Sequence, residues 1–286
     1  AGSSSLKFQL FEMDDESVIT SGVIERIGLE DSIFTIKYDG KKTVTTSPIK
    51  DHKVAVELLL DTLIEKGIVK DLDEIKGVGH RVVQGGAYFD SSVIIDEDVV
   101  NKIDELKSLA PLHNPAHLTG YYAFKEAIPN AGAVAVFDTA FHQTLEPKCY
   151  IYPIPYKYYT DYKVRKYGAH GTSHYYVSRR CIEMLGNPEH SKIIVAHLGA
   201  GGSLTAIKDG KSVNTSMGFT PLAGIMMGTR SGDVDPSVID YLIEEVGMDM
   251  KEVIKMLNKE SGLLGISGIS SDFRDVQNAA IEGNER

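Results

Sequence analysis

The chain has 286 residues, enough for two domains that each bury an apolar core. Its net charge of −10 argues against a general nucleic-acid binder, because a phosphate backbone requires a basic partner surface. The two cysteines, Cys149 and Cys181, form neither a metal motif nor a disulfide framework, and no apolar run approaches the roughly 18 residues of a membrane helix; both observations favour a cytoplasmic protein.

The first half of the chain alternates predicted strands and helices. A small-residue turn, Ala1-Gly2-Ser3-Ser4-Ser5, leads into a strand whose alternate apolar side chains share one face. Asp39-Gly40 predicts a hairpin, because both residue types accept the positive φ of a tight turn. Strands are expected over 33–38, 43–46, 75–83 and 133–137, and helices over 54–66, from Asp96 onward and over 115–128.

The second half centres on residues 191–235. A strand over 193–196 enters a glycine-rich turn, and a strand over 204–207 follows, ending at the hairpin signal Asp209-Gly210. A dinucleotide fingerprint is rejected because its glycines must open a helix, and a P-loop because Thr205 stands where its first glycine belongs. The turn therefore either cradles phosphate oxygens with its backbone or serves only as a tight turn.

The remaining segments define the domain organisation. A Tyr/Pro-rich crossing over 150–162 has no helical period and is interpreted as the change of domain, which predicts domains over 1–148 and 149–286. Helices are expected over 172–185, 236–247 and 250–258, and the chain ends in a polar tail.

A short internal repeat links the two halves. Gly199-Ala200-Gly201-Gly202-Ser203-Leu204 aligns with the first six residues, so that Ser203 lies over Ser5. Two phosphate-type turns that each lead into a strand predict a duplicated α/β fold, with two similar domains facing one nucleotide across a cleft. Because the chain starts inside such a turn, an amino-terminal segment is expected to be missing.

Four polar groups next to glycine or proline turns could transfer a phosphoryl group: Arg81, Asp138, His170 and Arg230. Two arginines and a histidine can neutralise the charge on the phosphoryl oxygens, and the aspartate can orient the acceptor or hold metal-bound water. Each has a plain alternative. Arg230 could pair with a nearby aspartate, Asp138 could cap a turn, Arg81 could be a surface arginine, and His170 could be a hydrogen-bonded turn residue.

The remaining histidines give weaker signals. His113 and His117, like His170 and His174, are four residues apart, but no zincin glutamate or cysteine partner accompanies them, so zinc binding is rejected. His197 could belong to the core or touch phosphate, and the sequence does not separate these alternatives.

Several ordered segments resemble those of acetate kinases, which belong to the superfamily of acetate and sugar kinases, heat-shock proteins and actin. The resemblance spans the whole chain, and its motifs are highly specific. The segments are Ala1-Gly2-Ser3-Ser4-Ser5-Leu6-Lys7, Gly79-His80-Arg81-Val82-Val83, His113-Asn114-Pro115, Phe137-Asp138-Thr139-Ala140-Phe141-His142, Tyr167-Gly168-Ala169-His170-Gly171-Thr172-Ser173-His174, His197-Leu198-Gly199 and Gly228-Thr229-Arg230-Ser231-Gly232-Asp233.

The resemblance implies two similar domains of an actin-like, ribonuclease H-like duplicated fold with a cleft between them, the second domain being truncated in this chain. It also implies an enzyme that moves the γ-phosphoryl group of ATP to acetate with Mg²⁺, giving acetyl phosphate and ADP, and that forms a homodimer. By motif, Asp138 matches the catalytic carboxylate, Arg81 the acetate-binding arginine, and His170 and Arg230 the groups that stabilise the transferred phosphoryl. Val83, Leu112 and Pro221 match the acetate methyl pocket. The matching nucleotide-binding positions are Lys7, His197, Leu198, Gly199, Ala200, Gly201, Asp272, Phe273 and Arg274.

The chain departs from the family pattern in three ways. Ala200 replaces an asparagine that helps to hold the phosphates, which predicts weaker ATP binding, and Ala169 replaces a phenylalanine of some members. The family's metal-binding asparagine and glutamate lie outside this chain, so its metal ligands stay unassigned. The rival functions are a propionate or butyrate kinase and a nucleotide-binding protein without catalysis.

Overall fold

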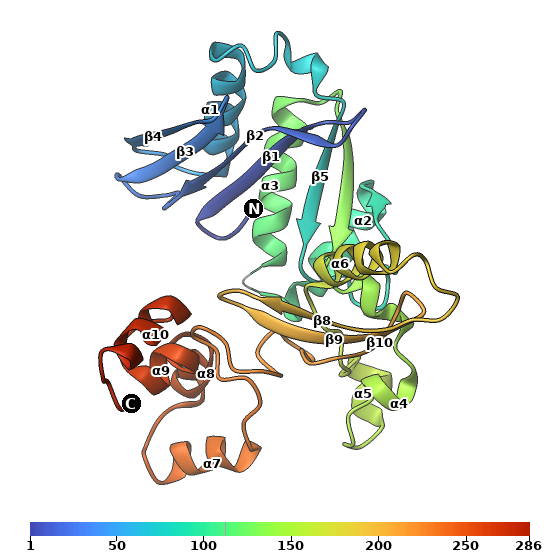
Figure 1. Cartoon of the computed structure of the whole chain (residues 1–286), viewed down its shortest axis with the longest axis vertical. Coiled ribbons are helices and arrows are strands. Elements are labelled where there is room, and N and C mark those ends of the chain that lie inside the picture. Colours follow the sequence, from blue (N-terminus) through green and yellow to red (C-terminus); the bar gives the residue numbers. More distant parts are fainter. Residues whose placement is uncertain (112) are drawn as a thin grey trace. The chain divides into compact units, whose positions relative to one another are not determined.

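The computed structural model describes residues 1–111 and 113–286, and these form two compact units, Ala1–Phe137 and Asp138–Arg286 (Figure 1). Each unit combines sheets with helices, as predicted for an α/β chain. The boundary expected after Lys148 lies inside the second unit, so the assignment of acyl-substrate and nucleotide roles to residues 1–148 and 149–286 stays a prediction. Leu112, expected in the methyl pocket, lies outside the described residues.

The first unit contains two sheets. One is antiparallel with the order β1-β2-β3-β4; in the other, β7 pairs in parallel with β5 and antiparallel with β6. The predicted Asp39-Gly40 hairpin joins β3 to β4, with φ of 51° and 68° at its two residues. The strands are β1 (Ser5–Glu12), β2 (Ser17–Glu25), β3 (Ser32–Tyr38), β4 (Lys41–Ser47), β5 (Gly77–Val82), β6 (Val93–Ile94) and β7 (Gly132–Phe137).

Helix α1 (His52–Glu65) packs its apolar face against the four-stranded sheet. Asp51 caps it by accepting a hydrogen bond from the Val54 N–H at 3.0 Å, and Gly67 ends it with φ of 63°. Its apolar residues recur at helical spacing and join sheet residues in one core. The buried members of this core include Leu6, Ile24, Phe34, Ile36, Ala55, Val56, Leu59 and Leu63.

Two further helices of the first unit were both predicted; one packs against β5, and the other packs against that helix. Asp96 caps α2 (Glu97–Glu105), and α3 (Asn114–Ala127) begins with a proline in its first turn. Fully buried Asn114 donates to the carbonyls of Gln84, at 3.0 Å, and Ile103, at 3.1 Å. This side chain therefore ties the segment after β5 to both helices.

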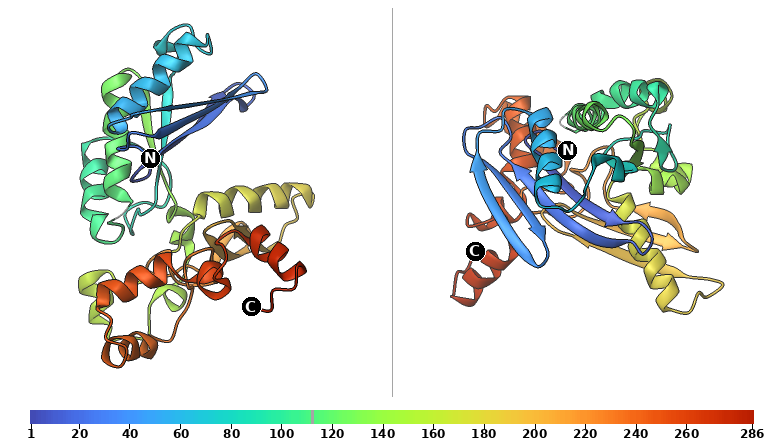
Figure 2. Two further views of the ribbon diagram at one scale, coloured as in Figure 1. Left: turned by 90° about the vertical axis from the view of Figure 1, so that its left-hand side faces the viewer. Right: turned by 90° about the horizontal axis from the view of Figure 1, so that it is seen from above.

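The second unit is built on a three-stranded antiparallel sheet that follows the predicted pattern of strand, glycine turn, strand, Asp-Gly hairpin and strand. Its order is β10-β9-β8, with φ of 49° at Asp209 and 75° at Gly210 in the hairpin. Helix α6 (Gly171–Met184), predicted over 172–185, contacts β8. Figure 2 gives two further views of these elements. The strands are β8 (Lys192–Leu198), β9 (Gly202–Lys208) and β10 (Lys211–Thr215).

One sequence expectation is corrected, and the polar tail gains a helix. The crossing over 150–162 contains a short helix over Lys157–Tyr162, where the rings of Tyr156 and Tyr159 lie against each other at a tilt with centroids 5.5 Å apart. One turn of helix opened by a proline precedes it. The polar tail is largely helical, because Asp272 caps it by accepting from the Arg274 N–H at 2.9 Å. The remaining helices are α4 (Pro147–Tyr150), α5 (Lys157–Tyr162), α7 (Pro236–Glu244), α8 (Met250–Lys259), α9 (Gly262–Ser267) and α10 (Phe273–Ile281).

No helix within the described ranges is both long enough and apolar enough to span a bilayer.

Candidate functional site

The glycine turn between β8 and β9 is stabilised by two backbone hydrogen bonds. The Gly199 N–H donates to the Gly201 carbonyl at 3.0 Å, and the Ala200 carbonyl accepts from the Gly228 N–H at 3.1 Å. Gly199 and Ala200 are exposed. The second bond fixes the segment that leads to Arg230 against the turn, although about thirty residues of sequence separate them.

Arg230 and His170 converge on this turn within the second unit. A Cβ atom added to Gly201 would lie 2.8 Å from Nη2 of Arg230 and 3.5 Å from Cε1 of His170. The other guanidinium nitrogen, Nη1, donates to the Pro221 carbonyl at 2.7 Å. Because a side chain at position 201 would displace these groups, glycine is required there for the close approach of two donors.

The two aspartates that follow Arg230 in the sequence accept hydrogen bonds from backbone N–H groups. The Asp233 carboxylate accepts from the Gly224 N–H at 2.8 Å, and the Asp235 carboxylate accepts from the Ser237 N–H at 2.9 Å. Burial lowers the pKa of Arg230, but arginine stays cationic near neutral pH. The guanidinium is thus a partly buried positive charge held by a carbonyl at a glycine turn, which suits an anionic ligand.

His170 occupies a left-handed backbone conformation at the start of α6, with φ of 57° and ψ of 20°. Non-glycine residues adopt this conformation at a cost, and such strain is concentrated at functional sites. Its Nδ1 lies 2.9 Å from Oγ of Ser203, and its ring stacks on that of His197 with centroids 4.0 Å apart. His197 in turn contacts Oγ of Ser173 at 2.9 Å through Nδ1. His197 therefore lies beside the turn, next to His170.

Two further histidines lie beneath these groups and are fully buried. Nε2 of His174 lies 2.7 Å from Oγ of Ser203, and Nδ1 of His142 lies 2.9 Å from Oγ of Ser212. Burial lowers the pKa of His142 to about 4 and that of His174 to about 3, so both rings are neutral at physiological pH. Within residues 1–111 and 113–286, no group of three or more His, Cys, Asp or Glu side chains could hold a metal ion.

Asp138 directly follows β7, at the strand end where the sequence placed it, and only 2% of it is exposed. Its carbonyl accepts from the Gly171 N–H at 2.8 Å, and a Cβ on Gly171 would clash with that carbonyl. Glycine at position 171 thus lets α6 begin directly against Asp138. The negative charge of the Asp138 carboxylate raises the pKa of His142, but burial of that ring lowers the pKa by more.

The candidates in the first unit lie on its strands. Arg81 belongs to β5, opposite Val136 of β7, and is exposed; Val83 follows β5 and is half-buried; Lys7 is exposed on β1. Pro221 belongs to the second unit, as do Asp138, His170 and Arg230. The predicted convergence of all four catalytic groups, and the methyl pocket, therefore stay predictions.

The remaining nucleotide candidates begin helix α10. Arg274 forms an ion pair with Asp272 at 2.6 Å, and Phe273 is 63% exposed. The preceding residue, Ser271, lies against Gly228, because a Cβ added to Gly228 would be 2.9 Å from the Ser271 carbonyl and 3.3 Å from that of Ala200. The start of α10 thus adjoins the glycine turn, and its exposed aromatic ring is available for stacking.

Sequence reasoning missed the buried side chains behind His170. Ser203 and His174 were not proposed as site residues, although Ser203 follows the glycine turn and His174 lies one helical turn after His170. Both positions can be read from the sequence, but only the fold brings the polar atoms of Ser203, His174 and His170 together.

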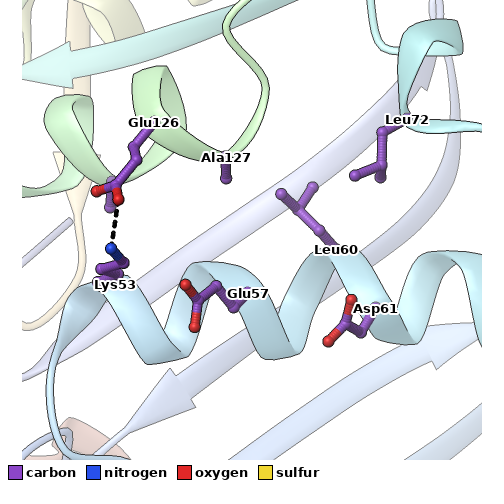
Figure 3. Close-up of a pocket in the computed structure, with 8 residues that line it drawn as sticks. Lys53, Glu57, Leu60, Asp61, Leu72, Glu126 and Ala127 are labelled. Atoms are coloured by element: carbon purple, nitrogen blue, oxygen red, sulfur yellow. Dashed lines mark hydrogen bonds and ion pairs between the residues drawn. The ribbon is translucent and has the colours of Figure 1, made fainter.

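The first unit contains a hollow of about 430 Å³. Figure 3 shows it between α1 and α3, with Lys53 and Glu126 forming an ion pair at one end and Glu57 and Asp61 on α1. None of the predicted site residues lines it, and its walls carry more acidic than basic groups. We therefore place the candidate site at the glycine turn.

Comparisons with known proteins identify the family of the chain. The model of the acetokinase family matches residues 1–286. The acetate kinase of Geobacillus kaustophilus (strain HTA426) is 58% identical over 287 aligned positions, which cover 100% of this chain and 72% of that protein.

Two solved structures are similar to the chain at a TM-score of 0.94 and 45% identity, covering 99% of this chain and 72% of theirs: an acetate kinase from Porphyromonas gingivalis and a propionate kinase from Francisella tularensis subsp. tularensis SCHU S4. These likenesses confirm the predicted α/β fold of the actin-like type. The chain belongs to the acetokinase family, whose function is the ATP-dependent phosphorylation of acetate.

Proposed function

We propose that this chain transfers the γ-phosphoryl group of ATP directly to acetate, with Arg81, Asp138, His170 and Arg230 as its catalytic side chains. The observation that carries the proposal is the convergence of His170 and Arg230 on Gly201, within a turn whose sequence resembles the family's phosphate-binding turn. Phosphoryl transfer requires positive charge and hydrogen-bond donors at the equatorial oxygens of the transferred group. A cationic guanidinium and an imidazole side by side supply both.

Each group has a separate role in the proposed reaction. Arg81 binds the acetate carboxylate through its planar fork, which leaves one carboxylate oxygen directed at the γ-phosphorus. That oxygen forms the new O–P bond while the bond from the γ-phosphorus to the β–γ bridging oxygen breaks and ADP leaves. Asp138 orients the acceptor, and Arg230 and His170 stabilise the charge on the phosphoryl oxygens.

The acetate methyl group is proposed to lie against Val83, Leu112 and Pro221. The position of Pro221 supports its part in this pocket, because its carbonyl accepts a hydrogen bond from the Arg230 guanidinium at 2.7 Å. One residue would then contact the acyl group and position the arginine that meets the phosphoryl group. A substitution at Pro221 would therefore also change the position of Arg230 at the reacting phosphorus.

ATP is proposed to bind along Lys7, the turn from His197 to Gly201, and Asp272 to Arg274. Backbone groups of the glycine turn face the phosphates, and the exposed ring of Phe273 stacks on the base. Ala200 adds no polar side chain to this turn, so the backbone alone supplies its contacts.

Mg²⁺ is proposed as the cofactor that enters with ATP. A nucleotide-bound Mg²⁺ needs only one or two protein carboxylates, because the phosphates and water fill its other positions, and the buried carboxylate of Asp138 fits such a role. When bound, the ion neutralises charge on the β- and γ-phosphates.

The direct test measures acetyl phosphate formed from ATP and acetate, together with ATP binding. The proposal expects acetate-dependent turnover that is lost in folded Arg81→Ala, with ATP affinity unchanged, because Arg81 contacts only the acyl substrate. Tight ATP binding without any turnover by the unsubstituted protein would instead support the non-catalytic alternative.

The similarity to a propionate kinase favours a second candidate substrate. A methylene group changes binding in an apolar pocket by only about 1–3 kcal/mol, so acetate and propionate differ modestly. Measurement of kcat/KM for acetate, propionate and butyrate decides between them, and a higher value for propionate would reassign the substrate.

We further propose a homodimer that works in the cytoplasm. Cys149 and Cys181 are both free thiols, as expected in a reducing compartment, and the dimer rests on the family resemblance. Light scattering during size-exclusion chromatography measures the oligomeric mass, and fractionation of source cells measures the location.

A further inference from the structure

Ser203 lies between two histidines and contacts both through one oxygen. Its Oγ is 2.9 Å from Nδ1 of His170 and 2.7 Å from Nε2 of His174. Ser203 and His174 are fully buried, so neither can exchange these partners for bulk water. A serine hydroxyl carries a single hydrogen, and it can therefore donate to only one of the two rings.

The other nitrogen of His174 decides which ring receives that hydrogen. Nδ1 of His174 is buried and has no hydrogen-bond partner among the described residues. If Ser203 donated to His174, the proton of this neutral ring would be on Nδ1, as a buried N–H without an acceptor. Buried N–H groups without an acceptor are rare in proteins, because they lose their hydrogen bond to water and gain none in return.

The opposite arrangement gives an acceptor to both hydrogens that lie between the three side chains. His174 donates from Nε2 to Oγ of Ser203, and the Ser203 hydroxyl donates to Nδ1 of His170. The unpaired Nδ1 of His174 then carries only a lone pair. Burial lowers the pKa of His174 to about 3, which keeps this ring neutral and holds the direction of the relay.

We infer that His174 and Ser203 are positioning residues that fix the proton of neutral His170 on Nε2. Cε1 of His170, which joins the two ring nitrogens, faces Gly201, and Nδ1 is directed at Ser203, so Nε2 is the second nitrogen next to the atom that faces the turn. The relay therefore makes His170 a hydrogen-bond donor on the side of the glycine turn, beside Nη2 of Arg230. The effect of the relay on catalysis rests on the proposed phosphoryl transfer, whereas the assignment of the tautomer does not depend on that proposal.

Nitrogen-15 NMR of the histidine rings tests the tautomer without any substrate. The protein is labelled at its histidines, the His170 signals are assigned by comparison with His170→Asn, and spectra are recorded above about pH 8, where exposed histidines are neutral. We expect Nε2 of His170 to be protonated and Nδ1 to carry the lone pair. Protonation at Nδ1 in the unsubstituted protein overturns the inference, whether or not the protein is a kinase.

Two variants of His174 test whether the relay causes the preference. His174→Gln keeps a side-chain N–H that can donate to Ser203, whereas His174→Phe keeps a ring of similar shape without a donor. We expect the preferred tautomer in the glutamine variant and a mixture in the phenylalanine variant and in Ser203→Ala. An unchanged tautomer in folded His174→Phe or Ser203→Ala contradicts the relay.

Kinetics then connect the tautomer to catalysis. We expect kcat to fall by about 10- to 100-fold in Ser203→Ala and His174→Phe, because one positioned donor is lost at the phosphoryl group, with KM for ATP little changed. The glutamine variant should recover most of kcat. Equal losses in the glutamine and phenylalanine variants, in step with lower Tm, would indicate a purely structural role.

Discussion

The interiors of the two units are built from different residues. In the first unit, a continuous apolar core joins the four-stranded sheet to α1, with Ile24, Ala55 and Val56 fully buried. In the second unit, the fully buried side chains include His142, His174 and Ser203 with their hydrogen-bond partners.

This difference indicates two kinds of interior. Apolar burial stabilises a fold in proportion to area and tolerates small shifts, whereas a buried polar network is stable only when its atoms meet at hydrogen-bond distance. The second unit thus holds its donors in fixed positions behind the glycine turn. Substitutions in the first interior should mainly change stability, and those around the turn should mainly change catalysis.

The largest effect should come from the guanidinium at the turn. Arg230→Ala removes a charge proposed to meet the transferred phosphoryl group, and arginines in this role contribute about 10³-fold or more to kcat. The measurement is acetyl phosphate formation at saturating substrates, with Tm as a check on folding. Arg180→Ala, which removes an exposed arginine paired with Glu183 on α6, is the matched control and should keep activity. A loss of less than tenfold in Arg230→Ala would remove this arginine from the mechanism.

The apolar core should respond in stability. Ile24→Ala creates a cavity at a fully buried site and should lower the free energy of unfolding by about 2–5 kcal/mol. Ile94→Ala, at a 76% exposed side chain, should change it by less than about 0.5 kcal/mol. Urea unfolding of the three proteins measures the difference. Similar losses in both variants would contradict the described core.

The polar interior should make stability depend on pH. Burial lowers the pKa of His142 to about 4, against about 6.5 in the unfolded chain, so the unfolded chain binds more protons between these values. The contribution of His142 is complete above about pH 6.5 and is lost as the pH falls toward 4, by up to about 1.4 kcal/mol per pH unit.

Urea unfolding of the protein and of His142→Gln between about pH 7 and pH 4 measures this contribution. The variant should show a shallower loss of stability with falling pH. His190→Gln, at an exposed histidine, is the control and should keep the original slope. An identical slope in all three proteins would mean that His142 is protonated as readily in the folded state as in the unfolded chain.

A smaller effect should separate catalysis from stability most cleanly. Gly201→Ala places a methyl group against Nη2 of Arg230, which can move because it ends a flexible side chain. We expect Tm to change little and kcat to fall about tenfold, since a displacement near 1 Å is costly for transfer. Gly132→Ala has only an ordinary contact with the Lys76 carbonyl at 3.7 Å and should leave kcat unchanged. Unchanged kcat in Gly201→Ala would show that this contact does not position the arginine.

The smallest effect concerns the departure from the family pattern in the turn. Ala200 is exposed, and Ala200→Asn adds an amide that can donate to phosphate oxygens, so KM for ATP should fall a few-fold, equivalent to about 1 kcal/mol. KM for acetate serves as the internal control and should stay constant. Equal KM values for ATP in the two proteins would refute the expected role of position 200.

The sequence by itself determined the features that depend on neighbouring residues. Asp39-Gly40 and Asp209-Gly210 predicted their hairpins because both residues of each pair accept positive φ, and Asp96 predicted the start of α2 because its carboxylate reaches a nearby N–H. Ordered family motifs likewise identified Asp138, His170 and Arg230 as candidates, since such motifs are read directly from residue type and order.

Only the tertiary structure decided which distant groups meet. Gly201 approaches Arg230 and His170, and Ser203 joins His170 to His174, because β9 and α6 bring together atoms that are far apart in the chain. The short helix α5 was likewise missed, because contacts between its tyrosine rings do not appear as a helical period of apolar residues. Local signals report the conformation of a segment, whereas a hydrogen bond across a fold depends on the path of all the chain between its partners.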